Sequence, residues 1–254
     1  MKSKFMTKLL ATVMAAAVVV TAVPATAMAA PVYNKSQVLY MTNTSGESDG
    51  YIHVTNLKKS QTIDKSSVKS DNTSVAKPYY LTRNTNSYKT EYFYKNWEPF
   101  SNSGYSYDIC LKLAKTGTAN ISFKIKGISA KQSVKVKVKP YVNPVKSLKI
   151  SGISADLKSK TKASAYVSNI KMTKTTAKAA VKVSAAKGWK VSRVQLYDAT
   201  KGKYTSIESY SKPVSEDTLY VGKLTKNKPY SVWISFVNTS DNSSLYCNYY
   251  INRD

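Results

Sequence analysis

The sequence is poor in the residues from which most active sites are built. It has one histidine, His53, and two cysteines, Cys110 and Cys247, among 254 residues. A catalytic zinc ion needs two or three imidazoles or a set of thiolates, and a serine or cysteine nucleophile needs an imidazole base. The 14 acidic residues show no marked pair of the kind that glycoside hydrolysis uses. We therefore expect no enzymatic activity, no metal site and no cofactor.

Arginine is scarce as well. Arg83, Arg193 and Arg253 are the three arginines, so nearly all of the 39 basic residues are lysine, against 14 acidic residues. Reading of base edges and bidentate binding of phosphate favour the planar guanidinium group, whereas lysine is a point charge on a flexible stem. The formal charge of +25 thus predicts a loose affinity for anionic polymers and no recognition of nucleic acid.

A long hydrophobic run is also missing. The apolar stretch over 9–23 is shorter than the roughly 20 residues that span a membrane. Three lysines precede it and small residues follow Pro24, which is typical of a secretory signal peptide over 1–29, cleaved after Ala29. The alternative is an uncleaved membrane anchor. Without the leader the chain has a formal charge of +22, no cysteine near its start and no sortase-type LPxTG motif. We expect a secreted protein without a transmembrane segment that associates non-covalently with the cell wall.

Alternation with period two dominates the rest of the chain, and no amphipathic helix of three or more turns is visible. The segment 133–139 places valines on one face and lysines on the other, as in a half-buried antiparallel strand. Pro140 and Pro144 interrupt the pattern before it resumes at Leu148. The sequence predicts an all-β fold of two tandem sandwiches, a module over 30–144 and a module over 145–254.

The first module resembles the bacterial immunoglobulin-like domains of group 2, which occur in intimin-like surface proteins. Two segments carry the resemblance, 68–76 (VKSDNTSVA) and 114–123 (AKTGTANISF), together with the valine strand that ends at Lys139. Gly117 is expected to make the turn into the second segment, and Ala119 to pack behind it. The resemblance implies an adhesin-type module or a spacer. In place of the family's short connection, this chain has an insert over 77–107.

The second module resembles a fibronectin type III domain. Leu224 is followed six residues later by Tyr230, and Val232, Ile234 and Phe236 then alternate. This matches the family's tyrosine corner, in which a tyrosine hydroxyl bonds to the backbone between two sheets. The family's early core tryptophan is not evident, so Trp189 or Trp233 is expected to fill that space.

The insert is rich in aromatic residues, whose flat apolar faces and polar tips suit sugar rings and protein surfaces. We single out four of them as a site for a glycan or for a host or bacterial surface protein: Tyr92, Tyr94, Trp97 and Phe100. The alternative is that these side chains form the core of an extra hairpin, since aromatic residues favour strands.

Lysines are dense at the start of the second module, where 11 lysines and one acid lie between Lys146 and Lys190. Such a field attracts teichoic acids or sulfated and sialylated glycans. The predicted polyanion-binding residues are Lys158, Lys160, Lys162, Lys171, Lys174 and Lys178. The alternative is that these lysines protect sheet edges and keep the protein soluble.

The two cysteines are favoured as free thiols over a disulfide, because Cys110 alternates away from its strand's core face while Cys247 lies on the core face of another strand.

Taken together, these features favour a non-enzymatic, secreted or surface-associated protein that binds or adheres to a ligand. The second hypothesis is a structural spacer without a ligand of its own.

Overall fold

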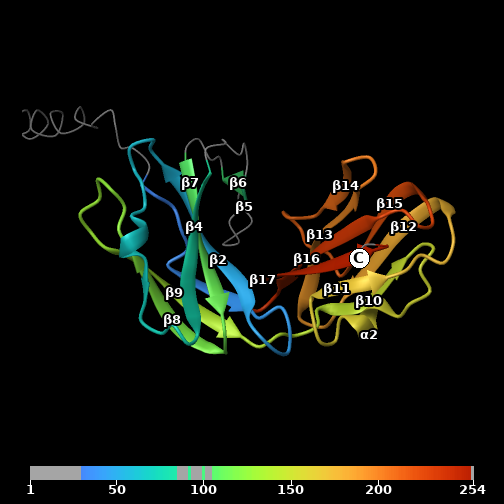
Figure 1. Ribbon diagram of the computed structural model, residues 1–254, viewed down its shortest axis with the longest axis horizontal. Helices are drawn as coiled ribbons and strands as arrows, with labels where there is room; N and C mark the ends of the chain where they lie inside the picture. The colour runs from blue at the N-terminus through green and yellow to red at the C-terminus, as the bar shows by residue number, and fades with distance from the viewer. Residues whose placement is uncertain (1–29, 85–90, 93–98, 101–104, 253–254) are drawn as a thin grey trace, which may run out of the picture. The chain divides into compact units, whose positions relative to one another are not determined.

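The computed structural model describes residues 30–84, 91–92, 99–100 and 105–252 (Figure 1). Strands dominate these residues, and the helices are single turns, η1 (Lys65–Ser67) and α2 (Leu157–Lys160). The all-β prediction is confirmed. Among the described residues, no helix has the length and hydrophobicity needed to cross a membrane.

The strands up to Lys139 form two facing sheets, which we call the first sheet pair. One has the order β1-β9-β8-β3 and the other β2-β7-β4, and β5 pairs with β6 in a short ribbon. β1 runs parallel to β9, and the other pairs are antiparallel. The strands are β1 (Ser36–Tyr40), β2 (Ser48–Leu57), β3 (Lys69–Ser70), β4 (Ala76–Asn84), β5 (Glu91–Tyr92), β6 (Pro99–Phe100), β7 (Tyr105–Leu113), β8 (Gly117–Phe123) and β9 (Gln132–Lys139).

Period-two alternation explains why these strands form a sandwich. In β9, Val134, Val136 and Val138 are buried, while Lys135 and Lys137 point to solvent. Buried residues of β2 and β7 face them from the opposite sheet. Burial of these aliphatic side chains contributes roughly 1.5–3 kcal/mol for each one, and the lysine face keeps the outer surface hydrated.

The two segments that carry the resemblance to bacterial immunoglobulin-like domains lie against each other. The Asp71 carboxylate accepts hydrogen bonds from the backbone N–H and the side-chain amide of Asn120, both at 2.7 Å. Gly117 has φ +147°, and a Cβ there would lie 2.7 Å from Val75 Cγ2. Glycine is therefore needed at the start of β8 both for its conformation and for the close packing of Val75.

The strands from Val145 onward form a second sheet pair, with the orders β10-β12-β15 and β11-β17-β16-β13-β14. β11 runs parallel to β17, and the other pairs are antiparallel. The strands are β10 (Val145–Ile150), β11 (Tyr166–Ile170), β12 (Thr176–Ala185), β13 (Trp189–Asp198), β14 (Lys203–Glu208), β15 (Glu216–Leu224), β16 (Tyr230–Asn238) and β17 (Ser244–Ile251). Strands β12 and β13, adjacent in sequence, lie in different sheets.

The tyrosine corner is present in this second pair. The Thr225 backbone N–H donates a hydrogen bond to the Tyr230 hydroxyl at 3.0 Å, and both Leu224 and Tyr230 are buried. Trp189 fills core space at the start of β13, whereas Trp233 points outward from β16. With the strand orders, these features show an immunoglobulin-like and fibronectin III-like β-sandwich fold.

The two ends of the aromatic insert lie in the paired strands β4 and β7. They pair from Ala76 opposite Leu113 to Asn84 opposite Ser106. Residues 77–84 and 105–107 therefore belong to the ordinary sheet of the first pair, and the segment that joins the two strands is 85–104. Tyr79 and Tyr80 lie on β4 with exposed side chains, while Tyr107 on β7 is buried.

Candidate functional site

A groove with four lysines lies beside strands β10 and β12. It has a volume of about 610 Å³, and we call it the lysine groove after Lys146, Lys149, Lys158 and Lys182. Lys146 and Lys149 project from β10, Lys182 from β12 and Lys158 from α2, and all four are exposed. The strand alternation that buries Leu148 and Ile150 in the core turns Lys149 outward.

The charges of this groove are poorly compensated. Lys149 lies directly opposite Lys182 in the antiparallel ladder, an arrangement of like charges that destabilises a sheet. Asp156 is the one acid among the described residues that line the groove. Its carboxylate caps α2 by accepting hydrogen bonds from the Ser159 hydroxyl at 2.7 Å and the Ser159 N–H at 3.1 Å, and these bonds lower its pKa. A bound anion would relieve the repulsion between the two facing lysines.

The structure brings one of the six predicted lysines into this groove, Lys158. The other five are exposed at other positions: Lys160 at the end of α2, Lys162 just after it, Lys171 and Lys174 between β11 and β12, and Lys178 on β12. The sequence reasoning missed Lys146, Lys149 and Lys182. Period-two alternation predicts that Lys149 and Lys182 both point outward. It does not predict that these two residues, 33 positions apart in the sequence, lie opposite each other.

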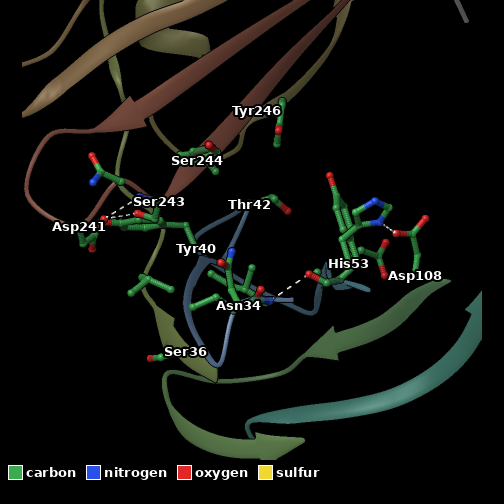
Figure 2. A pocket seen from close by; sticks show the side chains of 18 of the residues that line it. Asn34, Ser36, Tyr40, Thr42, His53, Asp108, Asp241, Ser243, Ser244 and Tyr246 are labelled. Carbon is green, nitrogen blue, oxygen red and sulfur yellow. Dashed lines mark hydrogen bonds and ion pairs between the residues drawn. The ribbon is translucent and has the colours of Figure 1, made fainter. Parts of the chain in front are cut away.

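A larger open cleft, of about 1140 Å³, is lined by β1, β2, β17 and the loop that precedes β17 (Figure 2). Six tyrosines line it: Tyr33, Tyr40, Tyr51, Tyr166, Tyr210 and Tyr246. His53 and Asp108 lie on one side of the cleft, and Asp241 with Ser243 lies on the other (Figure 2). Aromatic rings with few charged groups suit a neutral ligand better than an anionic one.

His53 lies on β2 and is half-buried. Its Nδ1 bonds to Asp108 Oδ1 across the β2–β7 pair, and the Asn84 side-chain amide donates to Asp108 Oδ2 at 3.0 Å. Burial opposes ionisation of Asp108, but the hydrogen bonds from His53 and Asn84 and the charge of His53 bring its pKa below the ordinary value. The imidazole is thus anchored to a carboxylate.

Both cysteines are free thiols, as the sequence predicts. Burial is the main cause of a raised pKa at each one, so both thiols stay protonated near neutral pH. A protonated thiol is a poor nucleophile and a poor metal ligand. In the part of the chain that the structure describes, no three His, Cys, Asp or Glu side chains gather in a way that could hold a metal ion.

The four aromatic residues predicted to bind a ligand fall outside what the structure describes. Tyr94 and Trp97 lie in undescribed segments, and for Tyr92 in β5 and Phe100 in β6 only the strand assignment is described. Their role as a ligand site remains a prediction.

Asp241, at the edge of the cleft, is expected to stabilise the folded protein in a way that depends on pH. It accepts hydrogen bonds from Lys139 Nζ at 2.6 Å and from the Ser243 N–H at 3.0 Å. Burial of Asp241 opposes its ionisation, but the bonds from Lys139 and Ser243 outweigh burial and lower its pKa. A carboxyl group with a lowered folded-state pKa adds stability above its unfolded pKa and loses that contribution as pH falls through the folded value.

We expect Asp241→Asn to reduce the free energy of unfolding at pH 7 by about 1 kcal/mol, since the ion pair is partly exposed. The difference from the wild type should shrink as the pH falls below the ordinary aspartate value of 3.8. Urea unfolding at a series of pH values measures it. Asp49→Asn is the control, because the Asp49–Lys112 pair is more exposed and should contribute less. A deficit that persists unchanged in acid would contradict this assignment.

No protein-family model matches the sequence, and no curated protein matches it. Among solved structures, domains 4–9 of the surface layer protein SbsC align with 88% of this chain at 13% identity and a TM-score of 0.29, and this chain spans 31% of that one. Fibronectin(III)-like modules of Clostridium thermocellum CbhA align with 87% at 12% identity and a TM-score of 0.25, over 93% of that chain. Titin domains I67–I69 align with 89% at 14% identity and a TM-score of 0.21, over 66% of that chain. Similarities this weak carry no argument about function.

Proposed function

We propose that this protein is a non-enzymatic, exported surface protein that is held at the cell wall by an anionic polymer bound in the lysine groove. The pairing of Lys149 with Lys182, in a groove with one acid, is the observation that supports this function most directly. We also propose a module boundary near residue 144 and a group 2 bacterial type for the first module.

The polymer that fits best carries a negative charge on each repeat. Lysine ammonium groups are strongly hydrated point charges, which attract phosphate without imposing a single geometry. An extended chain with repeated phosphates could contact several lysines of the groove at once, as in teichoic acids. Sulfated glycans share this chemistry and are the second source to be tested.

The test compares two variants that remove the same number of charges. The first, Lys149→Gln with Lys182→Gln, removes the facing pair of the groove. The second, Lys135→Gln with Lys137→Gln, removes two exposed lysines of β9. Binding of residues 30–254 to purified teichoic acid and to heparin is measured at about 0.1 and 1 M salt, between which the Debye length falls from about 10 to 3 Å.

We expect the groove variant to lose about tenfold in affinity at low salt and the β9 variant to lose little. The groove variant should fold at least as stably as the wild type, because it removes a like-charge contact. Equal losses in both variants would show that total charge matters and the groove does not. Absence of binding to either polymer would favour the structural spacer.

A further inference from the structure

The outer face of the five-stranded sheet differs from the other surfaces of this basic protein. Six aromatic side chains point outward from its five strands, among small polar residues. We call it the aromatic face, after Tyr166, Tyr197, Tyr204, Trp233, Tyr246 and Tyr250. Trp233 is 36% exposed, Tyr166 47% and Tyr204 55%. Large exposed aromatic side chains that gather on one face mark an interaction surface.

Strand register aligns this face in rows that cross the sheet. One row runs from Gln195 on β13 through Trp233 on β16 and Asn248 on β17 to Tyr166 on β11. A neighbouring row brings Tyr204 and Tyr197 together, and their ring centres lie 4.6 Å apart. Tyr204 also lies 5.8 Å from Trp233, which connects the two rows. Five strands span about 19 Å, enough for several sugar units.

The charge of the aromatic face indicates what it binds. A third row holds Arg193 and Glu208, which pair at 3.1 Å and cancel each other. None of the three rows contains a lysine, and Lys190 on β13 lies in the next row, opposite Val237. Lysines alternate along the outward faces of β9, β10 and β12. A solvated surface of this protein normally carries lysine, so the aromatic face departs from the pattern that keeps the chain soluble. A neutral polymer is the complementary ligand.

The side chains match a sugar chain in particular. Tyrosine and tryptophan present a flat apolar face with a polar edge, which suits the C–H face of a pyranose ring. Between the rings, the half-buried amide of Asn248 supplies both donors and an acceptor for sugar hydroxyls. Tyr166 and Tyr246 also line the open cleft, so the aromatic face continues into it. We propose that this face binds a neutral polysaccharide, at a site separate from the lysine groove.

The experiment is a pull-down of residues 30–254 with insoluble cellulose, chitin and xylan at about 1 M salt, where the lysine contacts are screened. Trp233→Ala and Tyr204→Ala remove the centre of the face. Tyr220→Ala is the matched control, because Tyr220 is 75% exposed on β15 in the other sheet. Circular dichroism establishes that each variant is folded.

We expect the wild type and Tyr220→Ala to bind at least one of these polysaccharides, and Trp233→Ala to bind about tenfold more weakly. Absence of binding to all three, or equal binding by Trp233→Ala, would overturn the proposal. So would sedimentation that shows a wild-type dimer and a Trp233→Ala monomer, since the face would then join two copies of the chain. Binding to anionic polymers is a separate measurement, so either proposal can fail alone.

Discussion

Replacement of Trp189 by alanine is expected to lower the free energy of unfolding by about 3–5 kcal/mol, the usual cost of removing a large buried aromatic side chain. Trp189 is 5% exposed at the start of β13, and its ring centre lies 5.1 Å from that of Tyr40. Alanine at this position would leave a cavity lined by core residues and would remove the contact with the Tyr40 ring. Urea unfolding followed by circular dichroism measures the effect.

Trp233→Ala is the matched control for this measurement. Trp233 has the same side chain on the same sheet but points outward, with 36% of its surface exposed. We expect it to cost about 1 kcal/mol or less. Similar losses for the two variants would contradict the assignment of Trp189 to the core. A small loss at Trp233 would also show that Trp233→Ala stays folded, so that its effect on binding can be measured.

Gly152→Ala is expected to have the second large effect, a loss of roughly 2–4 kcal/mol from strain and overpacking together. Gly152 has φ +84°, and a Cβ there would lie 2.6 Å from the Lys174 carbonyl oxygen and 2.8 Å from Met172 Cε. The backbone oxygen cannot move aside cheaply, because Thr173 N–H and its hydroxyl both bond to the Gly152 carbonyl, at 2.8 and 3.0 Å. The turn after β10 and the segment 171–175 would have to separate.

Gly188→Ala separates backbone strain from the steric clash. Gly188 has φ +82°, nearly the same as Gly152, but a Cβ there would meet nothing within 4 Å. Its expected cost is the conformational one alone, about 1–2 kcal/mol. Thermal or urea unfolding of the two variants should differ by the overpacking contribution. Equal losses would show that Lys174 and Met172 leave room for a methyl group.

Features that depend on local sequence were predictable. Alternation with period two predicts which face of each strand is buried, as β9 shows with its valines inside and its lysines outside. The tyrosine corner was predictable for the same reason, because Leu224 and Tyr230 lie six residues apart within one turn and its flanking strands. The opposite phases of Cys110 and Cys247 likewise follow from neighbours on their own strands.

Both candidate sites depend instead on which strands become neighbours. Lys149 meets Lys182 because β10 pairs with β12, and Tyr166, Trp233 and Tyr204 share one face because β11, β16 and β14 belong to one sheet. A strand's own alternation says which side chains point outward but not which strand lies beside it, and pairing depends on how the whole core packs. Local periodicity therefore specified the sandwich fold and the outward phase of these residues, while long-range strand pairing created the lysine groove and the aromatic face.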